Sequence, residues 1–268
     1  MKSDVTGEGE PVVLVPGGLT GWLSWEPHSK RLSENHKVVR VQLMAVDLGL
    51  QNEPIPANYS VDYETAALSR ALDDIKVEQA HFAAWSFGAE VTLNFALNNP
   101  GQVKSLTLIE PPAIWVIRSK GPLSEEQEED RKMEETLGPD DVSEAQLVWF
   151  IHFAGFVPQR VDPKTLPQWL VWFKHRQSLR TGDVVYRHED DIRRVRSFGK
   201  PVLLFKGEGS SPWLHRIVDI LAEEFPRAQV VTLPGGHAPH IASMEPFMRT
   251  FTGFLDSAPP WSWVSARK

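Results

Sequence analysis

Short, mostly apolar runs rich in valine and leucine recur along the chain and end at residues that break regular structure. Runs of this length are typical of strands that are buried on both faces of a parallel sheet. We predict strands at residues 12–15, 38–43, 81–85, 105–109, 201–205 and 229–233.

Segments with apolar residues at helical spacing lie between these predicted strands. They predict helices at residues 63–74, 89–97, 213–225 and 246–255. Strands that alternate with helices form βαβ units. We therefore expect an α/β protein with a mostly parallel sheet flanked by helices.

The alternation breaks in the middle of the chain, where a charge run at 124–135 is followed by aromatic residues at loosely helical spacing. We interpret residues 116–195 as a helical cap inserted over the sheet, and residues 1–115 and 196–268 as the core. The charge run fits a solvated helix face or loop. A tail at 258–263 carries two tryptophans, which we expect to pack on the core or on a partner.

Composition and charge narrow the classes of function. A length of 268 residues fits one α/β unit, and the net charge of -7 argues against a nucleic-acid-binding protein, which usually has a basic face. The chain has no cysteine, which excludes disulfides, thiolate metal sites and a cysteine nucleophile.

Residues 1–10 lack the apolar core of a signal peptide, and no apolar run reaches the roughly 20 residues of a membrane helix. We expect a cytoplasmic protein without membrane contact.

A serine lies between a predicted strand and a predicted helix, in the sequence Ala84-Trp85-Ser86-Phe87-Gly88. A strained turn there exposes the hydroxyl and requires small neighbours two positions away on each side. The segment resembles the G-x-S-x-G nucleophile elbow of the α/β-hydrolase superfamily, with alanine in the first glycine position. The resemblance extends from Val12 to about Leu255 and implies an α/β-hydrolase fold in which Ser86 is the nucleophile. The alternative is an ordinary serine helix cap.

A histidine follows two glycines after the last predicted strand, at Gly235-Gly236-His237. This resembles the histidine loop of the same family and implies that His237 is the general base for Ser86. His240 is not the match and is expected to line the pocket. A His-x-x-His metal pair lacks a third ligand, so no metal is expected.

The acid that orients His237 does not stand at the position that many relatives use. Many relatives place an aspartate after the strand equivalent to 201–205, but here Ser210 stands at that position. Glu110 ends the strand that follows the elbow, so it should lie on the same rim as Ser86. This placement is similar to that in the fungal zearalenone lactonase and in certain haloalkane dehalogenases. We assign Glu110, with Glu208 as the alternative.

An oxyanion hole requires backbone N–H groups that point at the developing alkoxide. We assign the N–H groups of Gly18 and Phe87, with Leu19 as the alternative donor to Gly18. The family resemblance supports this position, although relatives carry His-Gly where this chain has Pro16-Gly17.

Aromatic residues are concentrated beside these motifs and in the insertion, at the sheet edge where open α/β folds bind ligands. They predict an apolar pocket lined by Leu19, Trp22, Trp85, Trp115, Trp149, Phe153, Trp172, Trp213 and His240. Such a pocket suits a hydrophobic small-molecule substrate.

The family resemblance implies a serine hydrolase that cleaves a hydrophobic ester or lactone through an acyl-enzyme, without a metal or organic cofactor. The same triad serves carbon–carbon bond hydrolases and cofactor-free perhydrolases, and the same fold serves non-catalytic small-molecule binding proteins. The sequence does not decide between a monomer and a homodimer.

Overall fold

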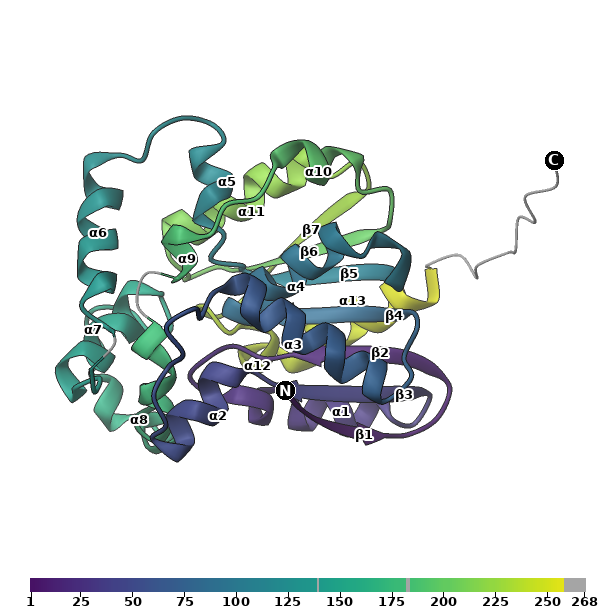
Figure 1. Ribbon diagram of the computed structural model, residues 1–268, viewed down its shortest axis with the longest axis horizontal. Coiled ribbons are helices and arrows are strands. Elements are labelled where there is room, and N and C mark those ends of the chain that lie inside the picture. Colours follow the sequence, from purple (N-terminus) through teal and green to yellow (C-terminus); the bar gives the residue numbers. More distant parts are fainter. Residues whose placement is uncertain (139, 182–183, 258–268) are drawn as a thin grey trace, which may run out of the picture.

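The computed structural model describes residues 1–138, 140–181 and 184–257. Within these ranges the chain forms a seven-stranded sheet in the order β1-β3-β2-β4-β5-β6-β7 (Figure 1). The strands are β1 (Lys2–Thr6), β2 (Glu10–Val15), β3 (His36–Gln42), β4 (Ala80–Trp85), β5 (Val103–Ile109), β6 (Val202–Gly207) and β7 (Ala228–Leu233). Strands β2 to β7 pair in parallel, whereas β1 pairs antiparallel with β3. The predicted α/β class and all six predicted strands are confirmed.

The helices of the core follow the strands in the expected alternation. They are α1 (Glu26–Leu32), α2 (Met44–Gln51), α3 (Val61–Asp74), α4 (Phe87–Asn98), α11 (Pro212–Glu224), α12 (Pro239–Ala242) and α13 (Met244–Ser257), with the 3-10 turn η1 (Gly21–Trp25) before α1. The four helices predicted from spacing correspond to α3, α4, α11 and α13.

Two layers of helices cover the two faces of the sheet (Figure 1). On one face, α3, α4 and α11 enclose the larger apolar core, to which β4 contributes Phe82 and Ala84. On the other face, α1 and α13 pack with Trp25 and Phe251 in a second core. Strand β4 lies between both cores, and all six of its residues are buried. This explains why its sequence is apolar except for His81.

The segment between β5 and β6 is helical. It contains α5 (Ile114–Arg118), α6 (Glu125–Glu135), α7 (Glu144–Phe153), α8 (Trp169–His175), α9 (Val184–Arg187) and α10 (Ile192–Ser197), with the 3-10 turn η4 (Arg176–Thr181) after α8. A capping box between Ser143 and Gln146 begins α7. Leu147, Ile151 and Trp172 form a third apolar cluster there. The division into core and cap at 116 and 195 stays a prediction, and the tail at 258–263 lies outside the described residues.

Three elements of the N-terminal region were not predicted. Strand β1 has a mostly polar sequence without a buried residue because it lies at the edge of the sheet. Helices α1 and α2 have only seven and eight residues, too few to show a helical period clearly. Among the described residues, no helix is both long enough and apolar enough to cross a membrane.

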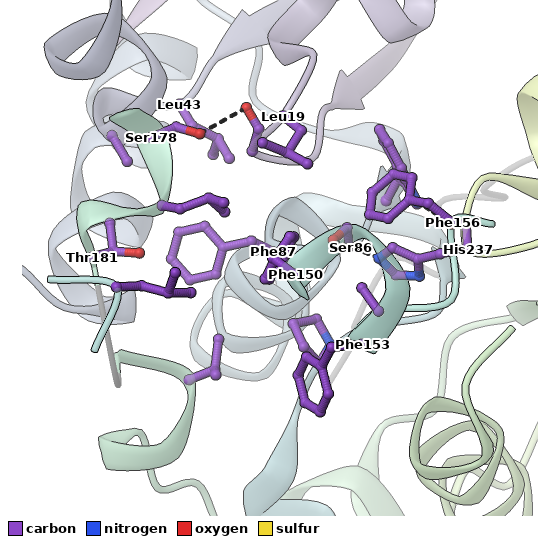
Figure 2. Close-up of a pocket in the computed structure, with 18 of the residues that line it drawn as sticks. Leu19, Leu43, Ser86, Phe87, Phe150, Phe153, Phe156, Ser178, Thr181 and His237 are labelled. Atoms are coloured by element: carbon purple, nitrogen blue, oxygen red, sulfur yellow. Dashed lines mark hydrogen bonds between the residues drawn. The ribbon is translucent and has the colours of Figure 1, made fainter. Parts of the chain in front are cut away.

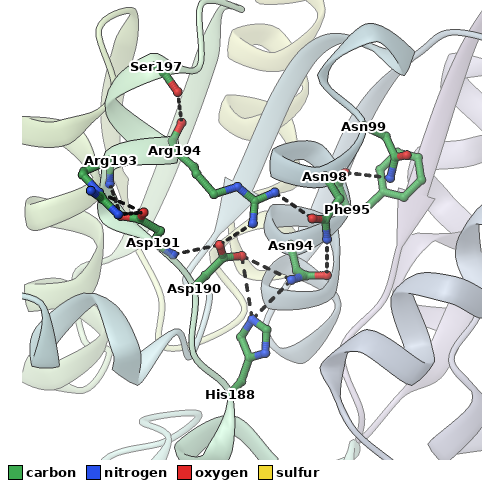
Figure 3. A network of polar contacts seen from close by, with 10 residues as sticks. All are labelled: Asn94, Phe95, Asn98, Asn99, His188, Asp190, Asp191, Arg193, Arg194 and Ser197. Atoms are coloured by element: carbon green, nitrogen blue, oxygen red, sulfur yellow. Dashed lines mark hydrogen bonds and ion pairs between the residues drawn. The ribbon is translucent and has the colours of Figure 1, made fainter.

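A polar network holds the helix that follows Ser86 against the segment between α9 and α10 (Figure 3). Asp190, whose side chain is 1% exposed, accepts from Arg194 at 2.7 Å and from Asn94 of α4 at 3.2 Å. Arg194 also donates to Asn98 Oδ1 at 2.6 Å. These charge-assisted bonds link α4 to Asp190 and to α10.

Candidate active site

Ser86 occupies a strained turn between β4 and α4. Its backbone has φ 55° and ψ -132°, a conformation that non-glycine residues rarely adopt. The turn requires close packing, because a Cβ atom on Gly88 would lie 2.2 Å from the carbonyl oxygen of Pro16. Ala84, in the first glycine position of the elbow, is fully buried. The sharp turn presents the Ser86 hydroxyl at the end of the sheet.

His237 lies on the loop after β7 and faces Ser86. Its Nε2 atom is 2.8 Å from Ser86 Oγ. The backbone of His237 is held on both sides: its N–H donates to the Gly155 carbonyl at 2.9 Å, and its carbonyl accepts from Trp85 Nε1 at 2.6 Å. Gly236 permits this approach, since a Cβ atom there would lie 2.2 Å from the Gly155 oxygen.

Glu110 lies at the end of β5 and completes a continuous chain of hydrogen bonds. Its Oε2 atom is 2.7 Å from His237 Nδ1. A carboxylate only accepts, so Nδ1 carries the proton and Nε2 is free to accept from the Ser86 hydroxyl. Glu110 also has positive φ, 45°, immediately before two prolines. The alternative acid, Glu208, lies on the exposed part of the neighbouring loop.

The Glu110 carboxylate is fully buried and receives two further hydrogen bonds. The Gly207 N–H donates to Oε1 at 2.7 Å, and the Ser210 hydroxyl donates to Oε2 at 2.7 Å. His215 Nε2 lies 2.7 Å from the Gly207 carbonyl and so supports the same peptide segment. These donors compensate for the loss of solvent around a buried charge.

Gly18 and Phe87, the residues predicted for the oxyanion hole, both line the cavity that contains Ser86. Phe87 is the first residue of α4, where backbone N–H groups have no acceptor within the helix. The Gly18 carbonyl accepts from the Ser178 hydroxyl at 3.1 Å, which ties this loop to η4 (Figure 2). The assignment of Gly18 rather than Leu19 as donor stays a prediction.

The cavity beside Ser86 has a volume of about 60 Å³ and mostly apolar walls. In Figure 2 the Phe156 and His237 side chains stand at one end, and Ser178 and Thr181 at the other. Among the described residues, no Asp, Glu, Lys or Arg lines it. Of the nine residues predicted for the pocket, four line this cavity: Leu19, Trp85, Phe153 and Trp213.

The other five predicted pocket residues do not line this cavity. Trp115 is buried in the core at α5, and Trp149 stacks on the far side of Phe153 with ring centroids 4.8 Å apart. Trp172 lines a separate groove. Trp22 lies in η1, where its backbone N–H donates to Gln42. A tryptophan beside a motif can face either side of its element, and spacing alone does not decide which.

His240 is the fifth of these residues and is fully buried behind Trp85. It packs between Trp25 and Phe247, and neither of its ring nitrogens has a hydrogen-bond partner among the described residues. Burial lowers the pKa of His240 well below its usual value, and repulsion from nearby histidines adds to the effect. The imidazole is therefore neutral and part of the core.

Several residues that line the cavity or support the acid carried no sequence motif. Ser178 and Thr181 belong to a 3-10 turn, and Phe156 belongs to the loop after α7. Ser210 was noticed only because it stands where relatives have an aspartate. Within the described residues, no group of three or more His, Asp or Glu side chains is placed to hold a metal ion.

Comparisons with known proteins identify the family of this chain. The model of the alpha/beta hydrolase family matches residues 12–250. The putative carbamate hydrolase RutD of Pseudomonas savastanoi pv. phaseolicola is 28% identical over 92% of this chain and 94% of its own. The pimeloyl-(acyl-carrier protein) methyl ester esterase of Nitrosomonas europaea is 24% identical over 92% of this chain and 96% of its own.

Solved structures show the same fold. The esterase EaEST from Exiguobacterium antarcticum superposes with a TM-score of 0.76 at 18% identity over 95% of both chains. The enol-lactonase from Burkholderia xenovorans LB400 gives a TM-score of 0.69 at 15% identity over 96% of both chains. With the family match spanning most of its length, the chain belongs to the alpha/beta hydrolase family of enzymes.

Proposed function

We propose that this protein is a serine hydrolase that cleaves uncharged esters or lactones through an acyl-enzyme. The observation that carries the proposal is the unbroken hydrogen-bonded chain from Ser86 through His237 to the buried carboxylate of Glu110. A serine on a strained turn, a base within reach and an acid behind the base are the elements of nucleophilic acyl transfer.

In the proposed mechanism, His237 Nε2 removes the hydroxyl proton as Ser86 Oγ attacks the substrate carbonyl. Glu110 holds the imidazole in the productive tautomer and stabilises the imidazolium. The N–H groups of Gly18 and Phe87 donate to the oxyanion. His237 then protonates the leaving oxygen, and a water molecule that His237 activates cleaves the acyl-enzyme.

The character of the cavity favours an uncharged substrate. Its walls are mostly apolar, and no Asp, Glu, Lys or Arg side chain among the described residues lines it. A substrate carboxylate placed there would lose its hydration without gaining a cationic partner. This argues for ester or lactone hydrolysis over hydrolysis of a carbon–carbon bond in a carboxylate-bearing substrate.

The relatives are compatible with this chemistry, since the two described above are named for the hydrolysis of a carbamate and of a methyl ester. Both reactions begin with attack on a carbonyl carbon that bears a leaving group. At identities of 28% and 24%, the substrates in these names are not assigned to this chain.

The proposal is tested by steady-state hydrolysis of p-nitrophenyl acetate and p-nitrophenyl butyrate. We expect turnover by the wild type, and loss of kcat by a factor of about 10⁵ or more in Ser86→Ala. Ser257→Ala, at the end of α13, is a matched serine control and should retain full activity. Equal turnover by Ser86→Ala and the wild type would refute the role of Ser86, and binding without turnover by the wild type would indicate a ligand-binding protein.

A further inference from the structure

A second cavity lies close to Ser86 and has no role in the mechanism described so far. It is an open, apolar groove with a volume of about 400 Å³. Its walls come from η1, from α8 and the loop before it, and from the histidine loop with α12. Leu23 and Ile241 line it although 47% and 44% of their surfaces are exposed to solvent. Exposed apolar residues that line a concave surface are typical of a ligand site.

Phe156 separates this groove from the cavity at Ser86. Its ring lines both, and so does that of Trp85. The Phe156 ring contacts the His237 imidazole edge to face, with centroids 4.9 Å apart, and stands beside it in Figure 2. The groove therefore borders the loop that carries the general base, through Gly236 and Ala238, at the end of the cavity opposite Ser178 and Thr181.

The chemistry of the proposed function determines which part of a substrate lies on this side. The acyl carbon–oxygen bond breaks as the proton on His237 Nε2 moves to the leaving oxygen, so the leaving alcohol must lie next to the imidazole. The acyl group must then point away from it, into the cavity of Figure 2. We propose, on the basis of the proposed function, that the groove binds a large apolar leaving group.

The two cavity volumes favour a small acyl group and a large leaving group. The cavity at Ser86, about 60 Å³, holds on the order of four water molecules and so suits a short acyl group. The groove, at about 400 Å³, lies in the range of sites that hold ring-sized ligands. The preferred substrate is thus a short-chain acyl ester of an apolar, ring-containing alcohol or phenol, with no charge on either half.

The test compares phenyl acetate with 2-naphthyl acetate, whose leaving groups have similar acidity but different apolar area. We expect kcat/KM of the wild type to be about tenfold higher for the naphthyl ester, because the second ring is buried in the groove. Lengthening the acyl group from acetate to octanoate in p-nitrophenyl esters should lower kcat/KM by a similar factor or more.

Ile241→Asp and, as a second variant, Leu23→Asp place a charge in the groove at exposed positions. Each should lower kcat/KM for 2-naphthyl acetate more than for phenyl acetate, and so reduce the naphthyl-to-phenyl ratio to about one. Val230→Asp is the matched control, since Val230 is 41% exposed on β7 and lines neither cavity. A ratio that both groove variants leave unchanged, or faster hydrolysis of octanoate than of acetate, overturns the inference while the proposed function stands. Absence of phenyl acetate turnover in the wild type overturns both.

Discussion

Ser210 donates its hydroxyl to the same oxygen of Glu110 that lies 2.7 Å from His237 Nδ1. The serine comes from the loop after β6 and the glutamate from the end of β5, so two neighbouring strand ends converge on one imidazole. In many relatives the loop after β6 carries the acid, and here it carries a donor to the acid. In this chain the carboxylate is at the end of β5, and the hydroxyl that donates to it follows β6.

Removing the carboxylate should impair catalysis more than binding. We expect Glu110→Gln to lower kcat by a factor of about 10³ to 10⁴ with little change in KM, because the neutral amide does not stabilise the imidazolium. The measurement is hydrolysis of p-nitrophenyl butyrate at saturating substrate. Glu208→Gln, on the same rim but exposed, is the matched control and should behave as the wild type.

A carboxylate at position 210, after β6, should also be able to replace the carboxylate of Glu110 at the end of β5. An aspartate at 210 would place its carboxylate close to the site that Glu110 Oε2 occupies, since Ser210 Oγ lies 2.7 Å from that atom. The double variant Glu110→Ala, Ser210→Asp should recover about tenfold to a hundredfold in kcat over Glu110→Ala alone. No recovery in a variant that folds with unchanged circular dichroism would show that position 210 does not reach the imidazole.

A charge on the acyl group should be strongly disfavoured. The p-nitrophenyl hemisuccinate ester differs from p-nitrophenyl butyrate mainly by a terminal carboxylate, which the apolar cavity cannot pair. We expect kcat/KM to be about a hundredfold lower for the hemisuccinate, which corresponds to about 2.7 kcal/mol of desolvation that is not compensated. Comparable values for both esters would indicate a cationic group at the site.

Stability should fall with decreasing pH because of the buried imidazole of His240. Burial lowers the pKa of His240 well below its usual value, so the folded state keeps this ring neutral while the unfolded state binds a proton below about pH 6.5. Its contribution is therefore complete above that pH and is lost as the pH falls, by up to about 1.4 kcal/mol per unit.

His240→Phe removes this titration and should flatten the dependence of the unfolding free energy on pH. The measurement is urea denaturation at pH 8, 6 and 5 for the variant and the wild type. We expect similar stability at pH 8 and a widening advantage for the variant at lower pH. Parallel curves for the two proteins would show that His240 is not protonated on unfolding in this range.

The alternation of buried strands and amphipathic helices was sufficient to predict an α/β protein with a mostly parallel sheet. Strand β4 is apolar from Phe82 to Trp85 because cores lie on both of its faces. A short apolar run of this kind is typical of a buried parallel strand. Strand β1 has one neighbour and a polar sequence, so it gave no such signal.

The residues of the candidate site were predictable where backbone geometry demands particular residue types. Ser86 needs small neighbours on its turn, and Glu110 lies where the strand next to β4 must end. Trp115 lies in the core and Trp172 lines the separate groove, because the direction of a helix side chain depends on how the segment between β5 and β6 packs on the sheet. Phe156 was not assigned for the same reason: its position follows from tertiary packing against His237.

The central claim is that His237 activates Ser86 for attack, and covalent capture of the serine tests it most directly. The measurement is intact-protein and peptide mass spectrometry after treatment with a fluorophosphonate. The account predicts one adduct per chain, located on Ser86, that forms at least about a hundredfold more slowly in His237→Ala. An adduct on another residue, or equal labelling rates in the two proteins, would contradict it.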